Sequence, residues 1–339
     1  MADTATVRGT TGAAPAMREM TYAAAICEAI CEEMTRDENV LVLGEDVALL
    51  GGTFKCTAGL YERFGEWRVR DTPISEPGFI GMAIGCAVLG LRPIVDLSFN
   101  DFLTVAIDQI CNQAAKFHYM SGGVWKVPLT IRTSYGAGRS QAAQHSQSLQ
   151  AWFAHMPGLK VVMPSDAAEA KGLLKTAIRD DNPVIFLDHK LCLNKVFQVP
   201  EGDYTIPFGR ARLARSGEDL TIAATGGLVL EALQAADKLA KEGKSAEVID
   251  IRSIVPLDRQ TIIESVKKTG RLVVADEGHL NCGVGAEIGM SVQEEAFYYL
   301  DAPIARVGTP NVMIPFSPTL EFPLIPKAKH IFEAAKRLL

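Results

Sequence analysis

The sequence predicts an α/β protein of two doubly wound domains, each with a mostly parallel sheet covered by helices on both faces. Short apolar runs alternate with amphipathic segments, as strands alternate with helices in such sheets. The alternation breaks between about Lys195 and Arg215 and then restarts. With 339 residues, 48% of them hydrophobic, the chain is long enough for two cores.

This break divides the chain into four parts. We expect a flexible N-terminal tail over residues 1–16, a first domain over 17–195, a linker over 196–209 and a second domain over 210–339. The tail is small and polar and lacks the apolar core of a signal peptide. The linker region, VFQVPEGDYTIPFGRARLARSGED, predicts irregular or hairpin chain.

Periodicity predicts the elements of the first domain. Residues 21–36 place Ile26, Ile30 and Met34 on one face, which indicates an amphipathic helix. The run after Pro77 is small and apolar and indicates a closely packed helix. The other elements are strands over 39–44, 92–97, 127–132, 159–165 and 182–188, and helices over 102–120, 149–155 and 167–179.

The second domain repeats this alternation. We expect strands over 220–225, 246–251, 271–277 and 302–308, and helices over 228–242, 258–268, 285–299 and 327–338. GVGAEIG, from Gly283, follows a strand and indicates either an anion site at a helix start or a tight turn.

Composition and missing motifs exclude several functions. A net charge of −6 argues against nucleic acid as a partner, and no apolar run reaches the roughly 18 residues of a membrane span. Seven scattered cysteines without a CxxC pair predict a reducing, cytoplasmic location. Cys27 and Cys31 lack a second ligand pair, so packing explains them better than metal binding.

Two polar residues stand out as candidates for chemistry. Glu76 precedes a run with no charge before Arg92 and is either a helix-terminus charge or a dry carboxyl suited to hydrogen-bonding a basic ring nitrogen. His145 lies in the loop sequence SQAAQHSQ, where it is either structural or an acid–base group.

Several stretches together resemble the beta subunit of thiamine-diphosphate-dependent 2-oxo acid dehydrogenases, the family of the pyruvate, branched-chain and acetoin enzymes. They are GEDV, DTPISEPGFIGMAIGCAVLGLRPIVDL, FNDF, DQICNQAAKFHYMSGG, AAQHSQ, PGLKVVMPSDAAEAKGLLKTAIRDDNPVIF and RLVVADEG. The resemblance covers residues 18–339. It implies a pyrimidine-binding thiamine-diphosphate domain followed by a transketolase C-terminal-like domain.

The resemblance also implies roles for individual residues. Glu76 matches the glutamate that contacts the aminopyrimidine ring of thiamine diphosphate and favours its imino tautomer. Phe102 is expected against the same ring, with Glu45 nearby. His145 matches the active-site histidine, near the substrate or the incoming lipoyl group.

A potassium site is a further implication. Some family members hold K⁺ at an AIRDNNP-type turn, which here reads AIRDDNP, with Asp181 where the family has Asn. A plain helix stop is the alternative interpretation. The matching residues are Leu129, Ala177, Ile178, Asp180 and Asn182.

The sequence lacks the GDG motif that binds Mg²⁺ and diphosphate in complete sites of this type. The resemblance therefore implies half a site, with Mg²⁺ and diphosphate held by an alpha subunit in an alpha2-beta2 heterotetramer. The reaction expected is oxidative decarboxylation of a 2-oxo acid, or cleavage of acetoin, with acyl transfer to a lipoyl acyltransferase component. Two alternatives stay open: a self-sufficient transketolase-like enzyme and a non-catalytic scaffold subunit.

Overall fold

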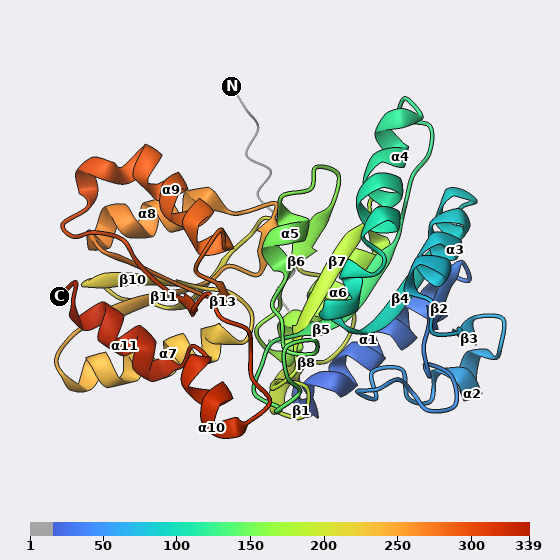
Figure 1. Cartoon of the computed structure of the whole chain (residues 1–339), viewed down its shortest axis with the longest axis horizontal. Helices are drawn as coiled ribbons and strands as arrows, with labels where there is room; N and C mark the ends of the chain where they lie inside the picture. The colour runs from blue at the N-terminus through green and yellow to red at the C-terminus, as the bar shows by residue number, and fades with distance from the viewer. Residues whose placement is uncertain (1–15) are drawn as a thin grey trace.

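The computed structural model describes residues 16–339, so all but the last residue of the predicted tail lies outside the described residues. Two β-sheets lie side by side in the molecule, each between layers of helices (Figure 1). Strands β1 (Met17–Thr21) and β8 (Val196–Pro200) form a separate antiparallel pair. Within the described part of the chain, no helix is long and apolar enough to cross a membrane.

The first sheet has seven strands in the order β12-β6-β7-β5-β4-β2-β3, and all neighbours are parallel except β12 and β6. In the order of the chain these strands are β2 (Val40–Gly44), β3 (Val69–Asp71), β4 (Arg92–Phe99), β5 (Thr130–Tyr135), β6 (Lys160–Val162), β7 (Val184–His189) and β12 (Ser253–Val255).

Both faces of this sheet are buried, which explains the continuous apolar runs of its strands. Along β2, Val40 and Val42 enter one core and Leu41 and Leu43 enter the other. The first core lies under α1 (Tyr22–Arg36), α2 (Leu60–Phe64) and α6 (Ala167–Arg179); the second lies under α3 (Glu76–Val88), α4 (Ala115–Met120) and α5 (Gln150–Ala154).

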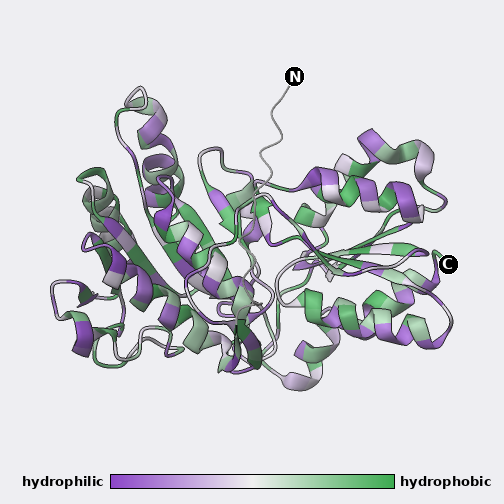
Figure 2. Ribbon diagram, turned by 180° about the vertical axis from the view of Figure 1, so that it is seen from behind, coloured by the Kyte–Doolittle hydropathy of each residue, from purple (hydrophilic) through white to green (hydrophobic). Residues whose placement is uncertain are grey.

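The second sheet has the order β14-β13-β10-β11-β9, parallel except for β9. Its strands are β9 (Arg212–Arg215), β10 (Leu220–Ala224), β11 (Ala246–Asp250), β13 (Leu272–His279) and β14 (Ala305–Thr309). Figure 1 shows it between α8 (Arg259–Thr269) with α9 (Val284–Ala296) and α7 (Leu228–Lys241) with α11 (Ala328–Lys336). Figure 2 shows apolar strands between helices with hydrophilic outer faces.

The predicted α/β alternation is confirmed, and the division of the chain into domains stays an interpretation. Strand β12 follows β11 in the chain but extends the first sheet, and one apolar core runs from α3 to α9. The two halves therefore share an edge strand and a core. The predicted linker contains β8, which pairs with β1 near the other end of the chain, rather than a local hairpin.

The segment predicted as one helix over 102–120 is interrupted. A 3-10 helix (Asn100–Thr104) comes first, followed by a π-helical turn (Gln109–Ala114) and α4. At its start the Thr104 hydroxyl donates to the Asp101 carbonyl at 2.7 Å, and the side chains of Asn100 and Asp101 bind another loop. Polar contacts at this end replace the regular helix that periodicity alone predicts.

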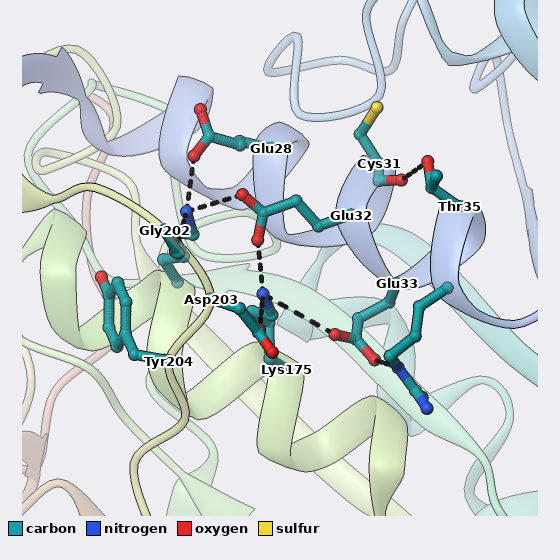
Figure 3. A network of polar contacts seen from close by, with 12 residues as sticks. Glu28, Cys31, Glu32, Glu33, Thr35, Lys175, Gly202, Asp203 and Tyr204 are labelled. Carbon is teal, nitrogen blue, oxygen red and sulfur yellow. Dashed lines mark hydrogen bonds and ion pairs between the residues drawn. The ribbon is translucent and has the colours of Figure 1, made fainter. Parts of the chain in front are cut away.

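Charged side chains lock α1 onto α6 (Figure 3). Lys171 and Lys175 of α6 are at most 1% exposed, and both donate to Glu32 of α1. Lys171 also donates to Glu28 at 2.5 Å, and Lys175 pairs with Asp203 of the linker. This network ties the helix pair and the linker together, because two buried ammonium groups need anionic partners.

Candidate active site

The predicted site residues follow the carboxyl ends of neighbouring strands in the first sheet. Glu45 follows β2, Glu76 follows β3, Phe102 follows β4 and His145 follows β5. Since the carboxyl ends of parallel strands meet at one edge, the topology brings all four side chains to the same edge. Ligands of doubly wound sheets bind at this edge.

Two carboxyl groups meet there without protein donors. Glu76 is the first residue of α3 and only 7% exposed, and no donor from residues 16–328 hydrogen-bonds its carboxylate. One carboxylate oxygen of Glu45, Oε1, is buried and has no hydrogen-bond partner in the described part of the chain. Burial and the charge of Glu76 raise the pKa of Glu45.

Buried polar atoms normally have hydrogen-bond partners, so a buried oxygen atom without one indicates that a bound ligand supplies the donor. The Glu45–Glu76 pair therefore fits a ligand that presents N–H donors or a basic ring nitrogen to it. An aminopyrimidine ring has both. The pair fits this half of thiamine diphosphate, which supports the role predicted for Glu76 and Glu45.

Beside the carboxyl pair lies an aromatic cluster of Phe54, Phe99, Phe102 and His145. The His145 ring stands edge-on to Phe99 and Phe102, with centroids 5.0 Å and 5.3 Å away. Phe54 contacts Phe99 at 5.5 Å. No hydrogen bond joins the His145 ring to residues 16–328, so its nitrogen atoms are available to a ligand.

A glycine-rich loop after β2 carries Phe54 to this cluster. Gly51 has φ +70°, and a Cβ there would lie 2.8 Å from the Ala58 Cα. The Thr53 hydroxyl lies 2.7 Å from that of Ser98 on β4. Glycine is therefore required for the turn that brings Phe54 against Phe99. Sequence reasoning assigned no role to this loop.

The loop 136–149, here called the His145 loop, is anchored on the first half of the chain by two side chains. The Asn100 amide donates to the Gln147 carbonyl at 2.9 Å and its carbonyl accepts from the Leu149 N–H at 3.0 Å. Asp101 accepts from the Gln147 N–H and side-chain amide. Sequence reasoning missed both residues, although they stand inside the quoted FNDF.

The second half of the chain anchors the start of the same loop. The Glu277 carboxylate accepts from the Ala137 N–H at 2.8 Å and pairs with His189 at 2.6 Å. Although burial alone would lower it, the charge of Glu277 raises the pKa of His189 to about 10. Glu321, in α10 (Pro318–Glu321), accepts from the N–H groups of Gly138 and Ser140.

A fully buried ion cluster lies within the strands that lead to the site. Arg132 of β5 donates to Asp188 of β7 at 2.6 Å and to Asp96 of β4 at 3.1 Å. The Ser134 hydroxyl donates to the other oxygen of Asp188 at 2.6 Å. Three neighbouring strands are thereby fixed in register close to their carboxyl ends, which supports a rigid site.

The predicted potassium turn is well ordered by protein groups. Arg92 donates to the carbonyl oxygens of Ile178 and Asp180 at 3.0 and 3.1 Å, and the Asp180 carboxylate accepts from Asn182 at 2.9 Å. Asp181, the departure from the family pattern, pairs with Arg92 at 2.7 Å. Each of these oxygens has a second lone pair that could still bind a cation. The protein contacts therefore neither require nor exclude K⁺, and the K⁺ site stays a prediction.

Within residues 16–339, no group of three or more His, Cys, Asp or Glu side chains could hold a metal ion. Cys27 and Cys31 are free thiols. The predicted residues thus combine an acidic pair, an aromatic cluster and a histidine at one sheet edge, with no metal cluster among the described residues.

Comparisons with known proteins agree with this geometry. A family model described as the transketolase pyrimidine binding domain matches residues 18–195, and one described as the transketolase C-terminal domain matches residues 209–331. A solved split-gene transketolase, described as an inactive beta4 tetramer, has a TM-score of 0.78 and 26% identity over 94% of this chain and 98% of its own.

Curated relatives cover nearly the whole chain. The beta subunit of acetoin:2,6-dichlorophenolindophenol oxidoreductase from Cupriavidus necator is 48% identical over 95% of this chain and 98% of its own length. The pyruvate dehydrogenase E1 component subunit beta of Rickettsia felis is 49% identical over 94% and 98%. The 2-oxoisovalerate dehydrogenase subunit beta of Bacillus subtilis is 46% identical over 90% and 94%.

Proposed function

The chain belongs to the beta subunits of the thiamine-diphosphate-dependent dehydrogenases that act on pyruvate, acetoin and branched-chain 2-oxo acids, and we propose that it supplies the aminopyrimidine half of a shared cofactor site. An alpha subunit supplies the other half, with Mg²⁺ and the diphosphate. The observation that carries this proposal is the pair of carboxyl groups, Glu45 and Glu76, which accept no hydrogen bond from residues 16–328.

Thiamine diphosphate, when bound, supplies the nucleophilic carbon that adds to the substrate carbonyl and stabilises the charge left by bond cleavage. Glu76, which is 7% exposed, would hydrogen-bond the ring nitrogen of the aminopyrimidine and hold a proton there, in a site whose burial would strengthen that bond. Glu45 would accept a hydrogen bond from the same ring through its unpaired oxygen Oε1. Phe102 would give the ring an apolar contact.

His145 lies in the aromatic cluster at the same sheet edge, in contact with Phe99 and Phe102. Phe99 and Phe102 fix its ring edge-on, and its nitrogen atoms have no bond to residues 16–328. It can therefore give or take a proton at the substrate or at an incoming lipoyl group. We assign the acyl acceptor as lipoamide on an acyltransferase component.

An alpha2-beta2 heterotetramer is the proposed assembly. The exposed apolar side chains Leu49, Trp67, Ile74 and Leu89 lie in or near the segments that carry Glu45 and Glu76, as a partner surface requires. A K⁺ ion at the turn of Ala177 to Asn182 is a further proposal, tested by activity in K⁺-free and K⁺-containing buffer.

One experiment separates this proposal from its alternatives. The purified chain is assayed alone and with an alpha subunit, using an artificial electron acceptor and then lipoamide. Activity only in the mixture supports the proposal. Activity of the lone chain favours a self-sufficient transketolase-like enzyme, and an inactive mixture favours a scaffold. A panel of pyruvate, branched-chain 2-oxo acids and acetoin then identifies the substrate.

A further inference from the structure

We propose that Lys190 is a positioning residue for His145: its buried ammonium group holds the main chain of the His145 loop so that the imidazole stays against the aromatic cluster. The inference rests on the active-site role proposed above for His145. It assigns a function to Lys190, which lies in none of the motifs named in the sequence analysis.

Lys190 comes directly after β7 and lies underneath the His145 loop. Its side chain is 1% exposed, whereas lysine side chains normally extend their charged ends into water. The Nζ atom donates to the main-chain carbonyl of His145 and lies 5.2 Å from the ring centroid of Phe99. One ammonium group thus contacts both the loop of His145 and an aromatic ring that fixes its imidazole.

Charged groups surround this ammonium without pairing with it. Asp101, Glu277 and Glu321 face it with negative charge, and Arg139 faces it with positive charge. Within residues 16–339, no carboxylate oxygen lies within 4.0 Å of Nζ, and the only hydrogen bond that it donates goes to His145. Burial lowers the pKa of Lys190 to about 8.

A buried ammonium with a single carbonyl acceptor is costly for the fold. An apolar residue would fill the same space at lower cost, so a structural role alone does not explain Lys190. The remaining anchors of the loop bind Gln147, Leu149 and residues 137–140. Lys190 is the side chain that hydrogen-bonds the main chain of His145 itself. This role explains why a lysine is buried at this position.

The test is a double-mutant cycle on the complex with the alpha subunit, measured as acyl transfer to lipoamide. Lys190→Met removes the donor and keeps the volume. We expect kcat to fall by about tenfold or more, as for loss of a charged hydrogen bond, with KM and cofactor affinity within about twofold. In a His145→Ala background the same change should alter kcat by less than about twofold.

The pH profile gives a second readout. Since Lys190 is protonated below about pH 8, the ratio of wild-type to Lys190→Met activity should be largest there and shrink as the pH rises through 8 to 9.5. Lys195→Met, an exposed lysine on the same segment, is the control and should behave as wild type. If Lys190→Met does not assemble, Lys190→Leu, which also lacks a donor, replaces it with the same expectations.

The outcomes distinguish two failures. If His145→Ala lowers acyl transfer but Lys190→Met does not, or if the two effects add, the inference about Lys190 is wrong and the proposed function stands. If His145→Ala leaves acyl transfer unchanged, the active-site role of His145 fails, and the inference fails with it.

Discussion

Glu76→Gln should nearly abolish activity while the fold survives. Glu76 is 7% exposed and receives no hydrogen bond from residues 16–328, so the protein itself loses little when the carboxyl becomes an amide. An amide cannot share a proton with a ring nitrogen as a carboxyl can. Removing one such preorganised group typically costs about 3–4 kcal/mol, a rate loss of several hundredfold.

Stability should change far less than activity. The substitution removes an acid from the start of α3, which costs about 0.3–1 kcal/mol, and it also removes repulsion between Glu76 and Glu45, which offsets that cost. We therefore expect the Tm to stay within about 4 °C of wild type. A large loss of activity with a small change in Tm would show that the substitution acts on the chemistry and not on folding.

The assay is turnover with an artificial electron acceptor by the complex with the alpha subunit, saturated with thiamine diphosphate and Mg²⁺. Glu66→Gln, an exposed acid nearby, is the control and should retain full activity. A Glu76→Gln complex within about threefold of wild type would refute the cofactor role of this carboxyl, provided that circular dichroism shows an intact fold.

Three further changes test other parts of the structure. His145→Ala should lower acyl transfer to lipoamide by about 10²–10⁴ and leave cofactor affinity unchanged, which stopped-flow and calorimetry measure. Glu277→Gln removes the partner of the buried His189 and should cost about 3 kcal/mol in thermal or denaturant unfolding. Because the pKa of His189 is raised to about 10, its stabilisation is complete below its unfolded pKa near 6.5, so the loss should be largest at pH 6 and fade towards pH 10. Glu32→Gln should cost about 2 kcal/mol because it deprives two buried lysines of an anion, whereas Asp203→Asn, at a side chain 64% exposed, should cost under about 1 kcal/mol; equal losses would contradict this interpretation of the network.

Local sequence predicted most strands of both sheets because most of these strands are buried on both faces. Val40–Gly44 and Val184–His189 are buried along their whole length, and their apolar runs VLVL and VIFL show no alternation with polar residues. It did not predict β1, β3, β8, β9 or β12, which are three to five residues long and pair with strands elsewhere in the chain. The residues of such strands do not by themselves predict a strand, because the strand forms through pairing with its partner.

The candidate site divides in the same way. Glu76 stood out because a single acid precedes an uncharged helix, and the family resemblance then gave it, Glu45, Phe102 and His145 their roles. The anchors Asn100, Lys190, Glu277 and Glu321 carry no local pattern, since each acts on a loop far from it in sequence. Only the folded structure brings them to the His145 loop.

Binding of thiamine diphosphate to the isolated chain tests the central claim, that this protein holds half a cofactor site. The described residues offer a partner for the aminopyrimidine and an aromatic contact, and they include no acidic, His or Cys cluster for a metal. Without Mg²⁺ and oriented donors, desolvation of the diphosphate is uncompensated. Isothermal titration calorimetry with Mg²⁺ should therefore detect no micromolar binding to the lone chain and one tight site per alpha–beta pair after mixing. Micromolar, Mg²⁺-dependent binding at one site per isolated chain would contradict the account.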